Sequence, residues 1–289
     1  SRGLGDVYKR HLLDMSQVIL GNIFGYSKDI AQADENLIRH LTLNSIRMYK
    51  NKFKKYGNVI LVFDSGDYWR KEKFPQYKGT RRLKQDEKKE LWRNLWNIVS
   101  TVRDELEDNF PYKVMRVGRA EADDIIAYLA KKYHQTEDIM IVSSDKDFQQ
   151  LQRYENVKQY SPKNKAKVVC SDPKEFLINH IVKGDSSDGI PNILSDDDTL
   201  INPDKRQKRL TQKVLDTINE DLAFGELPKG LEDNWKRNQS LVDLDRVPDW
   251  INDKIEKRWN EPIKGKRNRL FNYFIKHKLK NLMECIEEF

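Results

Sequence analysis

Four short apolar segments of this chain are each followed, at once or after two or three residues, by acidic residues, and this pattern limits the folds that the chain can adopt. The segments are residues 11–13, 58–63, 113–117 and 139–142. The acids that follow them are Asp14, Asp64, Glu121, Asp123, Asp124, Asp145 and Asp147. Each segment is short, apolar and bounded by turn-forming residues, which predicts a β-strand.

Helical patterns lie between these predicted strands. Residues 35–55 and 121–133 carry apolar side chains at the three- and four-residue intervals of an amphipathic helix. Alternation of strands and helices predicts an α/β fold with a mostly parallel sheet flanked by helices. Because ligands of such sheets bind outside the carboxyl ends of the strands, all of these acids fall at the expected ligand edge.

Carboxylates gathered at one edge repel one another and raise one another's pKa, so they need a compensating charge. Hard divalent cations such as Mg²⁺ and Mn²⁺ prefer oxygen ligands and would supply that charge. The formal net charge of the chain is +7, so the cluster does not follow from an acidic composition. The sequence therefore predicts a divalent-metal site. For Asp124 a second interpretation stays open, since an acid in the first turn of a helix also acts as a cap.

Another acidic pair, Asp185 and Asp188, follows the amphipathic stretch 173–183. The two carboxylates share a face if their segment is helical, and they need not do so if it is a turn. A solvated loop with no ligand is the alternative interpretation of this pair.

A basic and aromatic insert occupies residues 68–93. It holds ten Lys or Arg residues and four acids, with Tyr68, Trp69, Phe74, Tyr77 and Trp92 interleaved. Basic side chains bind phosphates and aromatic rings stack on unpaired bases, so this composition is typical of a nucleic-acid contact. Pro75 and Gly79 are expected to interrupt any continuous helix. The alternative is an ordinary amphipathic helical face whose aromatic residues pack inward.

Other features exclude some classes of protein and leave others open. Cys170 and Cys285 fit no metal-ligand spacing, and we interpret them as reduced thiols of a cytoplasmic protein. No apolar run approaches the roughly 18 residues that span a bilayer. Basic patches at 205–213 and 254–280 predict short helices that either bind duplex or form ordinary solvated surface. Residues 195–204 are expected to form a mobile acidic loop.

Six motifs occur in the order seen in the 5′-nuclease family, which comprises flap endonucleases, 5′ nuclease domains of bacterial polymerases and phage 5′-exonucleases. The motifs are Leu13-Asp-Met-Ser16, Val62-Phe-Asp64, Tyr77-Lys-Gly-Thr-Arg81, Glu121-Ala-Asp-Asp-Ile125, Ser144-Asp-Lys-Asp-Phe148 and Gly184-Asp-Ser-Ser-Asp188. Together they cover roughly residues 11–193. The chain resembles this family, and most closely its T-even phage ribonuclease H branch.

The resemblance implies a PIN-like α/β nuclease core at residues 6–183, including a helical arch at 65–110. It also implies a C-terminal helical DNA-binding region at 184–289. Two Mg²⁺ ions are expected, and Mn²⁺ can substitute for them. The residues that the resemblance implies as metal ligands are Asp14, Asp64, Glu121, Asp123, Asp124, Asp145, Asp147, Asp185 and Asp188. The first five cluster at one ion in the family, and the other four lie nearer the second.

The resemblance also implies roles for residues of the insert. Lys78 matches the lysine that approaches the scissile phosphate, and it joins Asp14, Asp64, Asp123 and Asp145 as a catalytic residue. Tyr77 matches a ring that stacks on a base. The residues expected to contact nucleic acid are Arg70, Lys73, Tyr77, Lys78, Arg81 and Arg82.

One departure from the family follows the last motif. The family usually continues with a glycine-rich hairpin ending in lysine, which binds duplex backbone and often a monovalent ion. Here residues 190–198 read Ile-Pro-Asn-Ile-Leu-Ser-Asp-Asp-Asp, without those glycines or the lysine. The resemblance therefore does not carry the monovalent-ion site to this chain, and duplex binding is expected to use other groups.

The expected function is that of a structure-specific 5′ nuclease, acting as 5′-3′ exonuclease on RNA–DNA hybrid or duplex DNA and as flap endonuclease. It would remove RNA primers or flaps in DNA replication. The expected partners are nucleic acids with a 5′ end or flap and a single-strand DNA-binding protein or clamp, with no membrane. A monomer in the cytoplasm is expected, the host's if the protein is phage-encoded.

Two alternatives remain at this point. One is a non-catalytic nucleic-acid-binding protein on a nuclease scaffold, which missing carboxylates would favour, but none of the expected acids is missing. The other is a PIN-type ribonuclease acting on single-stranded RNA. The basic insert and the C-terminal region argue against that enzyme.

Overall fold

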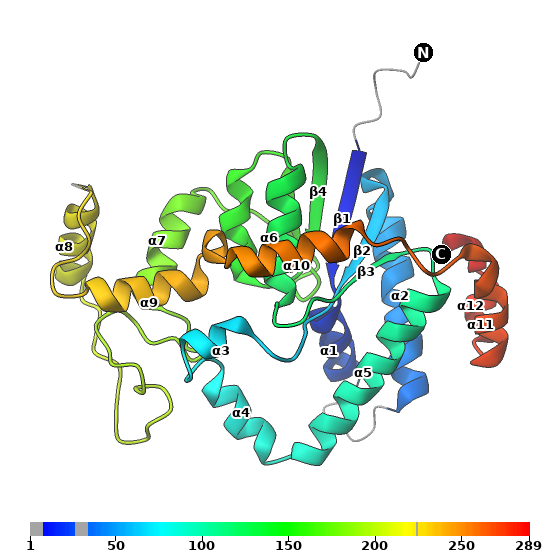
Figure 1. The fold of residues 1–289 in the computed structure, drawn as a ribbon, viewed down its shortest axis with the longest axis horizontal. Helices are drawn as coiled ribbons and strands as arrows, with labels where there is room; N and C mark the ends of the chain where they lie inside the picture. The colour runs from blue at the N-terminus through cyan, green and yellow to red at the C-terminus, as the bar shows by residue number, and fades with distance from the viewer. Residues whose placement is uncertain (1–7, 27–33, 224) are drawn as a thin grey trace.

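A six-stranded sheet forms the centre of the molecule in the computed structural model, which describes residues 8–26, 34–223 and 225–289 (Figure 1). The strands are β1 (Tyr8–Asp14), β2 (Asn58–Val62), β3 (Lys113–Met115), β4 (Glu137–Val142), β5 (Val157–Ser161) and β6 (Ala166–Val168). Their order is β3-β2-β1-β4-β5-β6, and only β6 runs antiparallel to its neighbour. The predicted mostly parallel sheet is confirmed.

The register of the central strands aligns their carboxyl ends. Asp14 lies beside Val62, and Val62 lies beside Met115. On the other side of β1, Leu13 lies beside Val142. The segments that follow these four strands therefore start from one edge, where the sequence analysis placed the acids.

The hairpin of β5 and β6 was not predicted. Val157 to Ser161 reads Val-Lys-Gln-Tyr-Ser, which has no apolar run, although four of its five side chains are buried. Gln159 is buried because its amide donates to the backbone oxygens of Ser143 and Asp145 at 3.0 and 2.6 Å. Pairing with β4 and these tertiary contacts stabilise the strand, so local sequence gives little sign of it.

Helices cover both faces of the sheet, as predicted. One face packs against α1 (Met15–Tyr26), α2 (Glu35–Lys52) and α5 (Lys89–Asn109), whose apolar side chains share one buried cluster. The opposite face packs against α6 (Ala122–Tyr133) and α10 (Asp249–Asn260). Asp34 caps α2 by accepting a hydrogen bond from the Leu37 amide at 2.7 Å.

The basic insert forms α3 (Trp69–Lys73), α4 (Gly79–Asp86) and the start of α5. Figure 1 shows these helices passing below the carboxyl ends of the strands as an open arch. The segment between α3 and α4 contains Pro75, and Gly79 begins α4, so the predicted interruption is confirmed.

The C-terminal third contributes helices to several parts of the fold. Its helices and the preceding one are α7 (Pro173–Lys183), α8 (Gln212–Ala223), α9 (Glu232–Val242), α10, α11 (Leu270–Lys276) and α12 (Lys280–Met283). The 3-10 turns of the chain are η2 (Lys54–Tyr56), η3 (Lys146–Arg153), η4 (Leu244–Arg246), η5 (Arg267–Arg269) and η6 (Ile286–Glu288). Helices α7, α8 and α9 share an apolar cluster with Phe74 and Tyr77 of the insert. The insert is thus anchored on the C-terminal third.

Residues 195–204, which were expected to form a mobile acidic loop, make several contacts with neighbouring segments. Asp197 pairs with Arg237 of α9 at 2.6 Å, and Asp198 pairs with Lys205 at 2.6 Å. Ser195 is buried and accepts a hydrogen bond from the Lys208 amide at 2.9 Å. These acids therefore hold the segment against its neighbours.

Candidate metal centre

Asp14 and Asp64 stand at the ends of two neighbouring strands and are held by hydrogen bonds. Asp14, the last residue of β1, accepts hydrogen bonds from the Gln17 amide at 3.1 Å and from Ser143 Oγ at 2.9 Å. Asp64 accepts one from the Ala122 amide at 2.8 Å. Both carboxylates thus lie at the N-terminal ends of helices, where backbone N–H groups favour negative charge.

Burial and neighbouring negative charges raise the pKa values of carboxylates at this edge. Burial raises the pKa of Asp14 to about 7, and the charges of Asp64 and Asp145 add to this effect. Burial, followed by the charges of Glu121 and Asp145, raises the pKa of Asp123 well above its usual range. Separate segments of the chain therefore bring their acids into one electrostatic unit.

Four carboxylates of this edge have no cationic partner. Within the described part of the chain, no Lys, Arg or His side chain forms an ion pair with Asp14, Asp64, Asp123 or Asp145. Burial and then the charge of Asp147 raise the pKa of Asp145 to about 6. Asp14 is buried and the other three are partly buried, and desolvated acids without counterions are costly unless a cation joins them, so this donor set fits divalent ions.

Asp124 differs from these acids because its carboxylate has both a cationic partner and hydrogen-bond donors within the protein. It accepts hydrogen bonds from the Glu121 amide and from Trp69 Nε1, both at 3.0 Å, and it pairs with Arg70 at 2.8 Å. With Glu121 it forms a capping box at the start of α6. These contacts match the helix-capping interpretation, and they leave Asp124 as a support for the acids beside it.

Glu121 is buried and surrounded by groups from the insert. Arg70 pairs with it at 2.7 Å, the Tyr77 hydroxyl donates to it at 3.0 Å, and Lys78 forms a further ion pair with it. Burial alone would raise its pKa, but Lys78 and Arg70 overcome that effect and lower the pKa of Glu121 to about 2. The base of the arch is thus bonded directly to the acid cluster.

The carboxylates of Asp145 and Asp147 make different contacts. Asp145 caps η3 by accepting the Asp147 amide at 3.0 Å. The carboxylate of Asp147 instead faces His180 and Asp185, and one ligand atom from each of the three residues lies within 4.8 Å of the others. Asp147, Asp185 and a histidine, His180, therefore form a separate group of possible metal ligands.

Asp185 and Asp188 occupy a tight turn after α7, which excludes the predicted helical alternative for them. Asp185 accepts hydrogen bonds from the Ser187 amide at 2.8 Å and the Ser187 hydroxyl at 2.6 Å. The turn begins at Gly184, whose φ is +66°, and a Cβ there would lie 2.4 Å from the oxygen of Ile190. Glycine is therefore required for the turn that aims both carboxylates at the cluster.

The prediction that Arg70 and Tyr77 contact nucleic acid is wrong, because both side chains are buried. Arg70 is 2% exposed and pairs with Glu121 and Asp124, so its guanidinium is not open to a phosphate. Tyr77 is 1% exposed and its hydroxyl bonds to Glu121 and Asp188, so its ring is not open to a base. Both side chains anchor the insert, because burial beside the acids fixes them there.

The remaining basic residues of the insert are more accessible. Lys73, Arg81 and Arg82 are exposed, and Arg81 reaches Asp188 with its guanidinium while donating from Nε to Ser187 O at 3.0 Å. Lys78 is partly buried, and its amide donates to Asp188 O at 2.7 Å. Lys78 and Arg81 thus contact the acid cluster directly, whereas Lys73 and Arg82 are exposed on the same insert.

Several site residues were not found from the sequence. The Ser143 hydroxyl donates to Asp14 and lies within hydrogen-bond distance of the Gln17 side chain. Trp69 donates a hydrogen bond to Asp124. Ser143 follows a predicted strand directly, which could have marked it. His180 lies one helical turn before Gly184, and its place on the inner face of α7 was the available signal.

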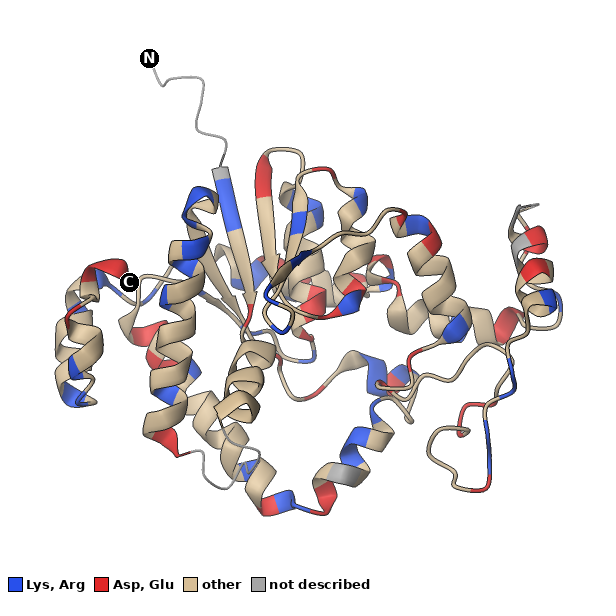
Figure 2. Cartoon of the chain, turned by 180° about the vertical axis from the view of Figure 1, so that it is seen from behind, with Lys and Arg blue, Asp and Glu red and all other residues tan. Residues whose placement is uncertain are grey.

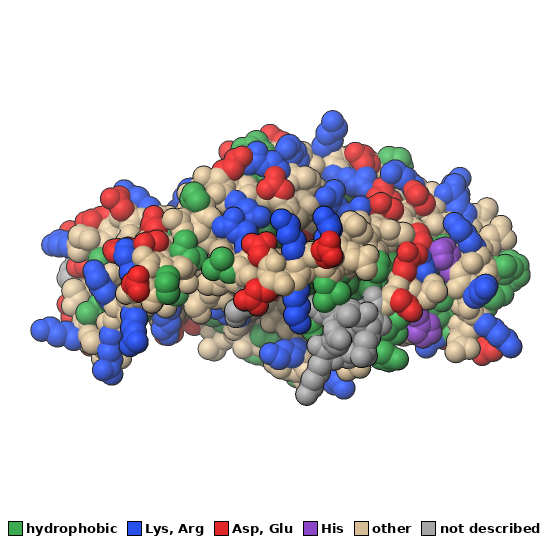
Figure 3. All heavy atoms as spheres, turned by 90° about the horizontal axis from the view of Figure 1, so that it is seen from below, with side chains coloured by type: hydrophobic (Ala, Val, Ile, Leu, Met, Phe, Trp, Pro, Cys, Tyr) green, Lys and Arg blue, Asp and Glu red, His purple; other side chains and the backbone are tan. Residues whose placement is uncertain are grey.

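Charge is mixed over the surface around this edge. Figure 2 shows Lys and Arg residues along α4 together with Asp and Glu residues near the ends of the strands. Figure 3, which views the molecule from the arch side, shows the two signs interspersed. The basic character of the chain is thus not concentrated in one uniform patch on this face.

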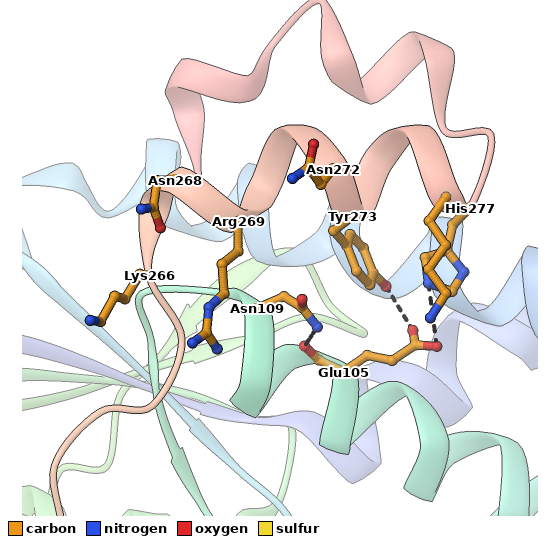
Figure 4. Close-up of a pocket in the computed structure, with 9 residues that line it drawn as sticks. Glu105, Asn109, Lys266, Asn268, Arg269, Asn272, Tyr273 and His277 are labelled. Atoms are coloured by element: carbon orange, nitrogen blue, oxygen red, sulfur yellow. Dashed lines mark hydrogen bonds and ion pairs between the residues drawn. The ribbon is translucent and has the colours of Figure 1, made fainter.

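A separate pocket lies between α5 and α11, away from the acid cluster (Figure 4). Glu105 accepts a hydrogen bond from the Tyr273 hydroxyl at 2.7 Å and pairs with the buried Arg39 at 2.7 Å. This network ties α11 to α2 and α5, so we interpret these polar groups as structural. No helix among the described residues is both long and apolar enough to cross a membrane.

Comparisons with known proteins agree with the geometry. The family model for the 5′-3′ exonuclease, N-terminal resolvase-like domain, matches residues 9–179, and that for T4 RNase H, C terminal, matches residues 173–289. The chain is 31% identical to the ribonuclease H of Enterobacteria phage T4, covering 96% of this chain and 95% of that protein. It is also 31% identical to a 5′-3′ exonuclease of Buchnera aphidicola, covering 52% of this chain and 53% of that protein.

Solved structures show the same fold. The T5 D15 protein, co-crystallised with metal ions, superposes with a TM-score of 0.63 at 18% identity. The match covers 86% of this chain and 96% of that one. The T5 5′-exonuclease with bound zinc superposes with a TM-score of 0.64 at 19% identity.

Proposed function

The chain belongs to the 5′-3′ exonuclease family of metal-dependent, structure-specific 5′ nucleases, and from this premise we propose that it removes RNA primers and flaps during DNA replication, using two Mg²⁺ ions. The substrates would be duplex DNA and RNA–DNA hybrid with a free 5′ end or flap. The alignment with the T4 ribonuclease H covers 95% of that protein, so the proposal draws on nearly its full length.

The observation that carries this proposal is the set of carboxylates without counterions. Asp14, Asp64, Asp123 and Asp145 come from four separate segments, and burial together with the charges of neighbouring carboxylates raises the pKa of Asp14, Asp123 and Asp145. A structural cluster would be expected to contain the basic partners that neutralise it, as Arg70 neutralises Asp124. These acids instead fit an ion site, and Mg²⁺ is the ion that prefers such oxygen ligands.

We propose that the nine predicted acids divide into three groups. Asp14, Asp64, Glu121 and Asp123 would hold one ion, and the acids nearest the second ion would be Asp145, Asp147, Asp185 and Asp188. Asp124 would support the first group through Glu121 and Arg70. When bound, the ions would supply a hydroxide at neutral pH and stabilise the leaving 3′-oxygen.

Lys78 would act on the substrate by exchanging partners. Its ammonium pairs with Glu121, and although burial opposes it, the charge of Glu121 raises the pKa of Lys78 well above its usual range. The side chain therefore stays protonated at neutral pH. A scissile phosphate at the cluster would accept from this ammonium, which would offset charge that develops on the phosphate in the transition state.

The arch would select the 5′ end. Lys73, Arg81 and Arg82 are exposed along the segment that borders the acids, where they can bind phosphates of an incoming strand. Anchoring of Arg70 and Tyr77 at the base of the arch would keep these side chains in register with the cluster. A strand without a free end would have to pass around the arch, whereas a flap can enter it.

The remaining parts of the proposal concern organisation and partners. Residues 6–183 would form the nuclease core and residues 184–289 a helical region that binds duplex. The protein would act as a monomer in the cytoplasm, that of the host if a phage encodes it, together with a single-strand DNA-binding protein or clamp.

Cleavage of a 5′-labelled flap duplex and of an RNA–DNA hybrid tests the proposal. We expect both to be cut in Mg²⁺ and neither to be cut in EDTA. Asp123→Asn and Asp145→Asn should abolish cleavage while flap binding changes little. Failure to cut either substrate at any enzyme concentration would refute the proposed function, and activity retained in both variants would refute the site assignment.

A further inference from the structure

His180 lies at the acid cluster although no prediction included it. It belongs to α7, one turn before Gly184, and only 6% of the residue is exposed. Phe176, four residues earlier on the same helix, stacks against its ring with centroids 5.7 Å apart. The packing of α7 on η3 and this stacking hold the imidazole at a fixed place beside Asp147 and Asp185.

The ring nitrogen of His180 that faces the acids has no hydrogen-bond partner among the described residues. Nε2 of His180 lies 3.0 Å from Asp147 Oδ1 and 3.9 Å from Asp185 Oδ2. Despite the short distance, neither Nε2 nor Asp147 Oδ1 makes a hydrogen bond. Two buried polar atoms without partners are costly, so an outside group is expected to satisfy both.

The spacing of these atoms fits a common ion. Ligand atoms about 2.1 Å from an octahedral ion lie about 3.0 Å apart when adjacent and about 4.2 Å apart when opposite. The distances of 3.0 and 3.9 Å from His180 Nε2 fall at and between these values, and all three ligand atoms lie within 4.8 Å of one another. One ion can therefore contact Asp147, His180 and Asp185 with little movement.

We propose that His180 is a nitrogen ligand of the second metal position, which therefore takes a transition-metal dication such as Mn²⁺ in preference to Mg²⁺. The inference rests on the proposed function, because it adds a ligand to the ion site of that nuclease. Imidazole is a good ligand for transition metals, whereas Mg²⁺ is bound almost entirely by oxygen atoms. An all-carboxylate position would not make this distinction.

Lys146 acts as the stand-in cation at this position. Its ammonium lies 2.9 Å from Asp185 Oδ2 and its side chain is 49% exposed, so it can move into solvent when an ion arrives. Arg81 and Tyr77 contact Asp188, on the other side of the turn, and leave the His180 side free. The position thus has a removable cation and a fixed set of three ligands.

Pulsed electron paramagnetic resonance of Mn²⁺ bound to the full chain tests this inference directly. A coordinated imidazole gives ¹⁴N modulation of the Mn²⁺ echo, which carboxylate and water ligands do not. We expect the modulation in the wild-type protein and its loss in His180→Gln. Calorimetry should show that His180→Gln weakens one Mn²⁺ site about tenfold or more but weakens Mg²⁺ binding much less.

His134→Gln is the matched control. His134 caps the carboxyl end of α6, a helix of 12 residues whose other end carries the acids, so it lies about 18 Å from them. This variant should keep both the ¹⁴N modulation and the Mn²⁺ affinity. If His180→Gln fails to fold, as judged by thermal unfolding in EDTA, the wild-type modulation still decides the question.

Wild-type protein that binds Mn²⁺ without ¹⁴N modulation would overturn the inference, as would modulation that persists in His180→Gln. An equal loss of Mn²⁺ and Mg²⁺ affinity without modulation would show instead that His180 only bonds to Asp147. Flap cleavage is measured on the same samples. Cleavage without ¹⁴N modulation would refute only the claim that His180 is a metal ligand. Modulation without cleavage would refute only the proposed nuclease activity.

Discussion

Arg70→Met would remove the guanidinium that neutralises two buried carboxylates. Arg70 pairs with Glu121 at 2.7 Å and with Asp124 at 2.8 Å, and its Nε donates to Leu241 O at 2.9 Å. The arginine side chain is 2% exposed and both carboxylates are fully buried. Methionine fills much of the same volume, so the main change is the loss of charge and hydrogen bonds.

The size of the effect follows from this burial. Removing one partner of a buried ion pair costs about 3–5 kcal/mol, because the charge left behind is neither solvated nor paired. For a chain of this size, each kcal/mol lowers Tm by about 2–4 °C, so we expect a decrease of about 6–20 °C. That is a large share of the roughly 5–15 kcal/mol that stabilises a typical domain.

Urea unfolding followed by circular dichroism, in EDTA, measures the free energy of unfolding. Arg153→Met is the matched control, since Arg153 pairs with Asp245 at 2.6 Å but both side chains are about one-third exposed. Such a surface pair contributes about 1 kcal/mol or less. A free energy of unfolding for Arg70→Met within 1 kcal/mol of that of Arg153→Met would refute the reasoning.

Three other predictions concern pH, catalysis and the turn. Because pKa values of about 7 for Asp14 and about 6 for Asp145 lie above the unfolded value, the metal-free native state binds more protons than the unfolded state. The Tm of the metal-free protein in EDTA should therefore decrease as the pH is raised from about 5 to about 7. An increase in Tm over this range, or a pH dependence that Asp14→Asn leaves unchanged, would contradict this. Lys78→Met should lower the single-turnover rate of flap cleavage by about 10²–10³-fold while the flap Kd changes by less than tenfold; an unchanged rate would exclude Lys78 from the transition state. Gly184→Ala should weaken Mn²⁺ binding in calorimetry, since its Cβ would lie 2.4 Å from Ile190 O, and an unchanged affinity would show that the turn tolerates a side chain.

The ligand edge could be predicted from the sequence because its signals are local. Apolar runs that end in acids mark strand ends, and parallel strands must share an edge, so Asp14, Asp64 and Asp145 were expected together. The capping role of Asp124 was also visible as an alternative, since an acid in the first turn of a helix favours it.

Other properties of the site depend on contacts between distant segments. Arg70 and Tyr77 looked like nucleic-acid contacts because a basic, aromatic composition does not reveal which side chains turn inward. Their partner Glu121 lies more than 40 residues away in the sequence. The position of His180 against Asp147 likewise depends on how α7 packs on η3, which no local pattern specifies.

Anomalous scattering from crystals soaked in Mn²⁺ tests the central claim most directly, because it locates ions without assuming a substrate. We expect two peaks at the carboxyl edge of the sheet, roughly 4 Å apart. One should contact Asp14, Asp64 and Asp123, and the other Asp147 and Asp185. Absence of any peak among these carboxylates, in crystals that bind Mn²⁺ elsewhere, would contradict the claim that the strand-end acids form a metal centre.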